Sequence, residues 1–171
     1  NGRAQSAIGR IYEESGQTAK ASPHYSAAIK ADPANPLLRM YGGKIARKLG
    51  QLKDSILHYQ VATRIRPDFL EAWVELGRVL AQSGQLEQAK KALGQAEVLA
   101  PRHSTTAINL GLVAQKEGFP QQARTWFQEA IKRDPVNMMG HLNLCMLEFA
   151  MRNFSGALKC ADDSLALHPR F

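Results

Sequence analysis

The stretch from Trp73 to Gly84, WVELGRVLAQSG, has the apolar spacing of an amphipathic helix, but glycine interrupts it at Gly77. Trp73, Leu76 and Leu80 are separated by three and four residues, which places them on one helical face. Glycine in a helix interior costs about 1 kcal/mol relative to alanine, so a repeated instance indicates a requirement. Glycines do recur here in steps of 34 residues. The series is Gly9, Gly43, Gly77 and Gly111, and the next step falls on Cys145.

Two further series of residues share this 34-residue period. One lies seven residues after the first and consists of Gly16, Gly50, Gly84 and Gly118, with Arg152 in the fifth copy. The other consists of Pro33, Pro67, Pro101, Pro135 and Pro169. Five copies account for all but one of the 171 residues. We therefore predict a single array, 1–171, with repeats at approximately 2–35, 36–69, 70–103, 104–137 and 138–171.

Each copy is predicted to form a helix, a turn and a second helix. After the break at Gly84, Leu86, Ala89 and Leu93 continue with the spacing of a second amphipathic helix. Gly84 and its equivalents suit a left-handed helix C-cap. The phased proline ends the second helix, because the residue before a proline disfavours the helical region. No copy has the alternation of a strand, so the fold class is all-α, and Gly77 is expected to face the second helix of its own copy.

The pattern within the copies resembles the tetratricopeptide repeat. Counting each copy so that its phased proline is position 32, position 8 is glycine in four copies, position 20 is mostly alanine and position 24 is mostly aromatic. The family's tryptophan position, position 4, holds Trp73 in the third copy. Position 20 holds Ala21, Ala89, Ala123 and Ala157, and position 24 holds Tyr25, Tyr59 and Phe127. The resemblance covers essentially the whole chain and implies an α-solenoid of antiparallel helix pairs, wound into a right-handed superhelix.

Some copies depart from the family pattern. Arg39 replaces the position-4 tryptophan in the second copy, so we expect its first helix to be the least stable. Pro23 falls inside the second helix of the first copy and is expected to kink or delay it. Cys145 stands where glycine is expected, and we interpret it as a buried small residue. Cys145 and Cys160 have neither metal-ligand spacing nor the pattern of a disulfide framework.

In the family, the first helices line a concave groove that binds a peptide or a segment of another chain. The residues at the groove positions of this chain change from basic to apolar along its length. The basic candidates are Arg10, Lys44, Arg47, Lys48 and Arg78, and the apolar ones are Leu112, Leu142, Met146 and Phe149. The functional interpretation is that the first group engages carboxylates and the second receives apolar side chains of a partner. The alternative is that the basic residues form a solvated face and the apolar ones are core awaiting a further repeat.

Position 6 carries asparagine in two consecutive copies, Asn109 and Asn143. In arrays resembling the superhelix of O-linked N-acetylglucosamine transferase, asparagines at this position hold the backbone of a bound peptide. A primary amide both donates and accepts hydrogen bonds, which matches a peptide group. Ordinary surface polarity is the alternative reading of these two residues.

The formal net charge of +7 raises the question of nucleic-acid binding. The second copy, 36–69, holds seven basic residues against two acidic ones, whereas the other copies are close to neutral. Because the positive charge is concentrated in one copy, it favours contact with an acidic segment of a protein over binding along a nucleic acid. No nucleic-acid partner is expected, and no apolar run is long enough to span a membrane.

The sequence offers little support for catalysis. The five histidines, His24, His58, His103, His141 and His168, are scattered without a metal-binding pair, and we interpret each as structural. There is no glycine-rich phosphate loop. We therefore expect no catalytic residues, no metal and no cofactor.

The sequence thus predicts a non-catalytic scaffold that binds a protein or peptide, with an acidic segment as one expected feature. The alternative function is the recognition or assembly domain of a larger glycosyltransferase or exopolysaccharide secretion protein. Because the chain begins at Asn1 and no polar capping helix follows the fifth copy, we expect a fragment of a longer chain, or self-association through the uncapped C-terminal repeat. The compartment cannot be read from these residues.

Overall fold

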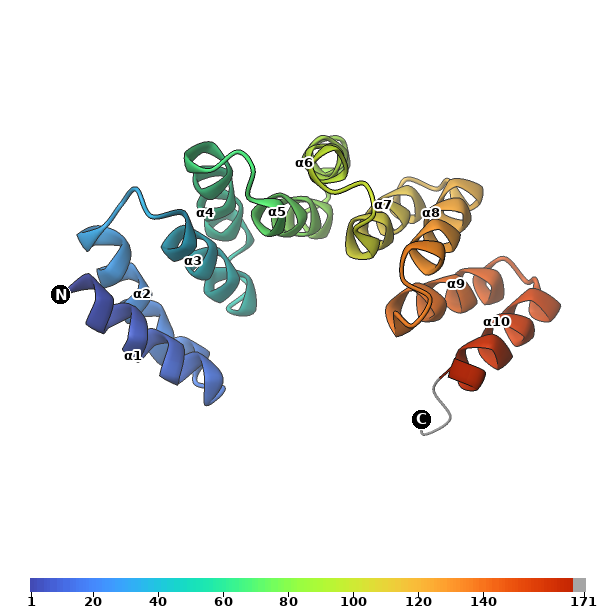
Figure 1. Cartoon of the computed structure of the whole chain (residues 1–171), viewed down its shortest axis with the longest axis horizontal. Helices are drawn as coiled ribbons and strands as arrows, with labels where there is room; N and C mark the ends of the chain where they lie inside the picture. Colours follow the sequence, from blue (N-terminus) through green and yellow to red (C-terminus); the bar gives the residue numbers. More distant parts are fainter. Residues whose placement is uncertain (168–171) are drawn as a thin grey trace. The chain divides into compact units, whose positions relative to one another are not determined.

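The computed structural model describes residues 1–167, which form ten α-helices and no strand (Figure 1). The five first helices have 13 residues each and are α1 (Gly2–Glu14), α3 (Pro36–Lys48), α5 (Leu70–Gln82), α7 (Ser104–Lys116) and α9 (Met138–Ala150). The second helices have 14 residues each and are α2 (Thr18–Ala31), α4 (Leu52–Ile65), α6 (Leu86–Leu99), α8 (Pro120–Arg133) and α10 (Phe154–Leu167). The predicted all-α class and the helix-turn-helix in each copy are confirmed.

Every first helix ends in a left-handed residue, as the phased glycines predicted. The φ angles are +74° at Gly16, +75° at Gly50, +80° at Gly84 and +83° at Gly118. Arg152 takes the same conformation in the fifth copy, with φ +59°. The next backbone N–H closes the cap, as where Phe119 donates to the Ala114 carbonyl at 2.9 Å. These C-caps reverse the chain within a few residues, so that the second helix packs back on the first.

The phased prolines stop the second helices in the predicted manner. The residue before the proline is extended, with φ −142° at Asp32, −131° at Arg66 and −144° at Asp134. The carbonyl of the proline then accepts a hydrogen bond from the position-4 side chain of the next copy. The donors are Arg39 Nε to Pro33, Trp73 Nε1 to Pro67 and His141 Nε2 to Pro135, at 3.2, 2.8 and 2.9 Å. Pro169 and His168 lie outside the described residues.

The chain divides into two compact units, Asn1–Gln85 and Leu86–Phe171, with the boundary between α5 and α6. In unit 1, α2 packs on α1 and α3, and α4 packs on α3 and α5. In unit 2, α7 packs on α6 and α8, and α9 packs on α8 and α10. Each unit has its own apolar core, around Tyr25 and Ile45 in unit 1 and around Phe127 and Leu147 in unit 2. The single array and its superhelical path remain predictions.

The glycines at position 8 lie against the aromatic rings at position 24. A Cβ atom built on Gly43 would come within 2.7 Å of the Tyr59 ring, and one on Gly111 within 2.5 Å of the Phe127 ring. Both rings are fully buried. The missing side chain therefore lets a large ring fill the space between the two helices, and this packing offsets the lost helix propensity. The contact expected at Gly77 remains a prediction.

The delayed helix start expected from Pro23 was wrong, because α2 begins at Thr18, 34 residues before its equivalent Leu52. A kink at Pro23 remains a prediction. The expectation for the two cysteines was also wrong. Cys145 and Cys160 form a disulfide bond, with 5.5 Å between their Cα atoms. The bond joins position 8 of α9, which is glycine in the other copies, to position 23 of α10, the residue before the position that is mostly aromatic elsewhere.

Candidate protein-binding surfaces

The basic residues of unit 1 lie beside two glutamates on neighbouring first helices. Glu13 of α1 is buried and receives Lys44 Nζ at 2.8 Å and Lys48 Nζ at 3.0 Å, both from α3. The hydroxyl of Tyr25 donates to the second oxygen of this carboxylate at 3.3 Å. Thus Glu13 connects α1, α2 and α3 through one carboxylate.

Glu75 of α5 has the corresponding role one repeat further. Its carboxylate lies 3.7 Å from Arg47 Nε of α3 and pairs closely with Arg78 of its own helix. The hydroxyl of Tyr59 in α4 donates to Glu75 Oε2 at 3.4 Å. The position-24 tyrosines of both repeats therefore hold an acid that pairs with two cations.

These contacts shift the pKa values of the groups involved. Burial raises the pKa of Glu13, but the hydrogen bonds and charges of Lys44 and Lys48 outweigh it and hold that pKa below the ordinary value. Burial, and then the neighbouring carboxylate, raise the pKa of Tyr25 and of Tyr59. Glu13 thus remains charged at neutral pH, and both tyrosines keep their protons.

We call Lys44, Arg47, Lys48 and Arg78 the basic ladder. Its four cations share two carboxylates, Glu13 and Glu75, which leaves a local excess of positive charge on α3 and α5. The side chains of Lys44 and Lys48 are 43% and 36% exposed, so solvent and solutes can reach them. The fifth predicted residue, Arg10, pairs with Glu14 of its own helix at 3.7 Å, and both side chains are exposed.

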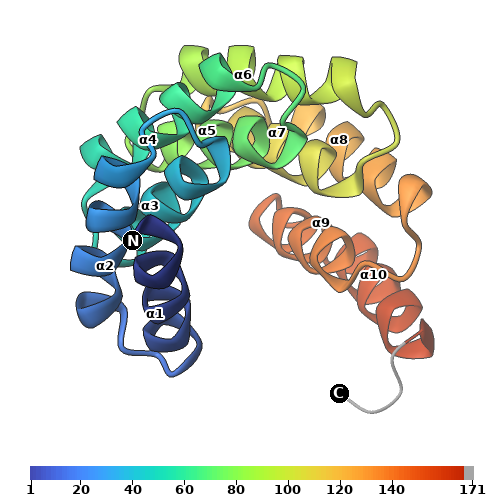
Figure 2. The ribbon, with the colours of Figure 1, turned by 60° about the vertical axis from the view of Figure 1, so that its left-hand side comes forward.

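The apolar candidates lie mainly on α9. Leu142, Met146 and Phe149 are 46%, 61% and 66% exposed, whereas Leu112 of α7 is half-buried. An open apolar hollow of about 670 Å³ lies between α9 and α10, which run side by side in Figure 2. The residues that line it are Cys145, Met146, Phe149, Ala150, Phe154, Ala157 and Leu158. Unit 2 therefore presents an apolar surface at its last hairpin.

The two asparagines differ in accessibility. Asn109 is 5% exposed, and its Nδ2 donates to the Thr105 carbonyl at 3.1 Å. Asn143 is partly exposed and makes the equivalent bond to Met139 at 2.7 Å. Such bonds to the preceding turn are common for polar side chains within helices. Asn143 is thus the more accessible of the two proposed peptide-holding amides.

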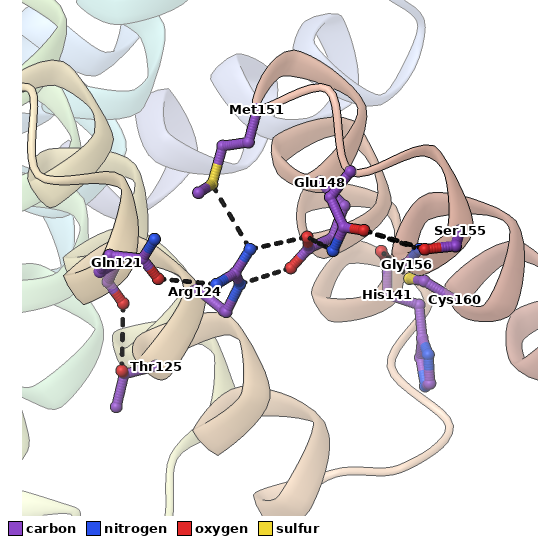
Figure 3. A network of polar contacts seen from close by, with 10 residues as sticks. Gln121, Arg124, Thr125, His141, Glu148, Met151, Ser155, Gly156 and Cys160 are labelled. Atoms are coloured by element: carbon purple, nitrogen blue, oxygen red, sulfur yellow. Dashed lines mark hydrogen bonds and ion pairs between the residues drawn. The ribbon is translucent and has the colours of Figure 1, made fainter.

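A further feature, which the sequence did not indicate, is a polar network that joins α8 to α9 (Figure 3). Arg124 forms a bidentate pair with the carboxylate of Glu148, with N–O distances of 2.5 and 2.8 Å. Asn153 donates to the same carboxylate at 2.7 Å. The hydrogen bond from Arg124, opposed by burial, lowers the pKa of Glu148. The network packs one repeat onto the next through charge.

Within residues 1–167, no group of three or more His, Cys, Asp or Glu side chains is placed to hold a metal ion. Three of the four histidines within residues 1–167 contact structural groups: His141 donates to a proline carbonyl, His24 lies 2.7 Å from Gln5, and His103 lies 2.8 Å from Thr106. The fourth, His58, has a buried Nδ1 without a hydrogen-bond partner among the described residues. None of the described helices is long and apolar enough to cross a membrane.

Comparison with known proteins agrees with the repeat pattern. Two sequence models of the tetratricopeptide repeat match residues 6–68 and 46–104. No curated protein sequence matches the chain.

Several solved structures resemble the fold. MamA from Desulfovibrio magneticus RS-1 has a TM-score of 0.83 at 17% identity, over 98% of this chain and 95% of that one. TTC0263 from Thermus thermophilus has a TM-score of 0.82 at 20% identity, over 99% and 93%. YrrB, described as a tetratricopeptide protein with an unusual peptide-binding site, has a TM-score of 0.71 at 18% identity, over 99% and 88%. With its phased caps, prolines and glycine–ring contacts, this chain belongs to the tetratricopeptide repeat family.

Proposed function

We propose that the protein is an interaction scaffold whose first helices in unit 1 bind an acidic segment of a partner protein. The fold suggests a scaffold, because repeats of this kind present extended surfaces to other chains. The observation that carries the acidic preference is the basic ladder, in which four cations share two carboxylates. An aspartate or glutamate of the partner would pair with cations whose charge Glu13 and Glu75 only partly neutralise.

A partner must bind the lysines of the basic ladder in the presence of the ion pairs that they already form within the chain. A partner carboxylate competes with Glu13 for Lys44 and Lys48, both of which are more exposed than Glu13 itself. Because ammonium groups have three donors, each lysine can contact Glu13 and a partner at once. Exposed ion pairs are individually weak and are screened by salt, so we expect modest affinity that depends on ionic strength.

The apolar surface of unit 2 is proposed to receive apolar side chains of a bound segment. Leu142, Met146 and Phe149 are exposed on α9, and Asn143 is available to hydrogen-bond a peptide group. The peptide-binding site described for YrrB, which shares this fold, supports a peptide as the class of partner. A role in a larger glycosyltransferase or exopolysaccharide secretion protein remains an alternative without a supporting contact in residues 1–167.

The proposal is tested with labelled oligoglutamate and oligolysine peptides, measured by fluorescence anisotropy at low and high salt. The wild-type protein should bind oligoglutamate with an affinity that falls as the salt concentration rises, and it should not bind oligolysine. Reversal of Lys44, Arg47 and Lys48 to Glu should abolish this binding. The matched control reverses Lys30, Lys53 and Arg64, which are exposed on the second helices α2 and α4 of the same unit.

A gain-of-binding variant separates a binding role from a purely structural one. Glu13→Gln with Glu75→Gln removes the internal competitors and should raise the affinity for oligoglutamate several-fold, while lowering the thermal stability. If the cations serve only the fold, this variant loses stability without binding better, and the proposal fails. Equal loss of binding in the control reversal would also contradict it, because net charge alone would then explain the effect.

A further inference from the structure

The contacts between successive repeats follow one register within each unit. Ile45, at position 10 of its copy, packs on Ala21 and Tyr25, which are positions 20 and 24 of the copy before. Leu147 packs in the same way on Ala123 and Phe127. The position-10 residue of each first helix is thus a knob that enters a hole formed by the preceding repeat.

Position 10 is buried in every copy but the first. Ile45, Val79, Val113 and Leu147 are at most 2% exposed, whereas Ile11 on α1 is 64% exposed. Ile8, at position 7, lies on the same face of α1 and is 37% exposed, together with the exposed Ala4 and Ala7. Hence α1 presents an apolar face of the kind that other first helices bury.

The hole is uncovered in the fifth copy. The position-20 residues Ala21, Ser55, Ala89 and Ala123 are fully buried, but Ala157 is partly exposed and lines the apolar hollow. Leu158 at position 21 is 67% exposed, although its equivalent Ile56 is buried. Leu165 at position 28 is 52% exposed, although its equivalents Ile29 and Thr63 are buried. Among residues 1–167, no position-10 side chain fills the hole of the fifth hairpin.

We propose that α1 of one copy of the chain packs into the hollow between α9 and α10 of a second copy. The register of the internal contacts aligns the two faces. Ile11 enters the hole beside Ala157 and Leu158, as Ile45 does beside Ala21. Ile8 meets Leu165, as a Cβ on Gly42 would meet Ile29.

The charged residues at this contact are compatible with the same register. Within unit 1, position 12 faces position 9 of the next copy, where Glu13 pairs with Lys44. At the proposed contact, position 12 is Phe149 and position 9 is Arg10. An arginine over a phenylalanine ring is a favourable cation–π pair, so Arg10, which pairs with Glu14 of its own helix, needs no acidic partner from the second copy.

Such a contact is heterologous, because each copy uses one face of α1 and a different face of its last hairpin. Heterologous contacts do not pair symmetrically and lead to rings or open chains. The protein should therefore associate head to tail, with a mass that increases with concentration. This contact uses no residue of the basic ladder, so the inference stands independently of the proposed binding of an acidic segment. It does share Met146 and Phe149 with the apolar surface proposed to receive a partner's side chains, so a second copy and that partner would compete there.

The test is sedimentation velocity on the whole chain, with Ile11→Glu to block the α1 face and Leu158→Glu to block the hollow. Wild type should form dimers and larger species, and each variant alone should be monomeric. An equimolar mixture of the two variants should form a one-to-one dimer and nothing larger, because the intact α1 of one fits the intact hollow of the other. Leu57→Glu and Val98→Glu, on exposed apolar residues elsewhere, serve as controls and should associate like wild type.

Other outcomes would overturn the inference. A symmetric contact through the hollow alone would leave Ile11→Glu associating like wild type and the mixture without a defined dimer. A monomeric wild type at all concentrations would show that the two faces do not meet. Circular dichroism of each variant establishes that it retains the helical content, since both substituted residues are exposed.

Discussion

The fourth repeat packs Gly111 under the ring of Phe127, whereas the fifth repeat has Cys145 at the glycine position, bonded to Cys160. Ala161 stands at position 24 of the fifth repeat, so the hairpin has no ring to fill its centre. The fourth repeat is also covered by the next one, while the fifth exposes large apolar residues on both helices. Two hairpins with the same backbone pattern are thus held by packing in one case and by a covalent bond in the other.

This difference shows that position 8 requires a small residue because the helices are close. Glycine satisfies the requirement by omitting the side chain, and cysteine satisfies it by bonding across the gap. The first solution depends on a complementary ring, and the second depends on oxidising conditions. Reduction should therefore affect only the fifth repeat.

The largest expected effect comes from filling the glycine position in the fourth repeat. Gly111→Leu drives a side chain into the Phe127 ring and should destabilise unit 2 by about 3 kcal/mol, the upper range for overpacking. Hydrogen exchange of α7 and α8, together with urea unfolding, measures this loss. Gly94→Leu is the matched control, because a Cβ at Gly94 meets nothing within 4 Å. Equal behaviour of the two variants would contradict the glycine–ring explanation.

Removal of the disulfide should have the next largest effect. Cys145→Ala with Cys160→Ala opens a loop with a sequence separation of 15 and should cost about 2 to 3 kcal/mol. Protection of α9 and α10 from hydrogen exchange should fall, while that of α7 is largely retained. A reducing agent should destabilise wild type by a similar amount and leave the double variant unchanged. Insensitivity of wild type to reduction would show that the bond does not hold this hairpin.

Loss of the ion pair between the fourth and fifth repeats should have a smaller effect on stability. Glu148→Gln removes the bidentate pair with Arg124 and should cost about 1 to 2 kcal/mol at neutral pH. Glu14→Gln, in a pair exposed on both sides, should cost nothing measurable.

The pH dependence of this pair has a defined sign. Because the folded pKa of Glu148 is below its ordinary value of 4.5, its contribution is present at neutral pH and is lost as pH falls through the folded pKa. Wild type should therefore lose more stability than Glu148→Gln between neutral pH and acid. Parallel melting profiles over this range would contradict the assignment.

The smallest effect concerns the left-handed residue that ends α9. Arg152 has φ +59°. This left-handed conformation is unfavourable for a residue that has a Cβ atom but not for glycine. Arg152→Gly should raise stability by about 0.5 to 1 kcal/mol, and Gly118→Ala at the same place in the fourth repeat should lower it by about 1 kcal/mol. Differential scanning calorimetry can resolve both shifts. A loss of stability in Arg152→Gly would contradict this prediction, because the side chain of Arg152 would then stabilise the protein by more than its backbone conformation costs.

The features that the sequence predicted correctly are determined by local backbone chemistry. Gly118 marks a cap because left-handed backbone favours glycine, and Pro135 marks a helix end because it constrains Asp134. Repetition of these signals established the class of fold. The candidate binding residues were placed by family position alone, and their role in binding remains a prediction.

Contacts between helices were harder to predict, because they depend on pairs far apart in the sequence. The repeat period does not indicate that Glu13 pairs with Lys44 and Lys48 of the next copy. Arg39 looked like a defect at position 4, yet its Nε donates to the Pro33 carbonyl as the indole of Trp73 does to Pro67. The disulfide could have been found, because positions 8 and 23 lie close in other copies, as Gly9 and His24 do.

A double-mutant cycle on Gly111 and Phe127 tests most directly whether the phased glycines exist to admit the ring. Gly111→Ala should destabilise the protein when Phe127 is present and should cost little or even stabilise it when Phe127→Leu removes the ring. The coupling should exceed about 1 kcal/mol, as expected for residues in contact. Additive effects of the two substitutions would contradict the claim, because the glycine would then be independent of the ring that it faces.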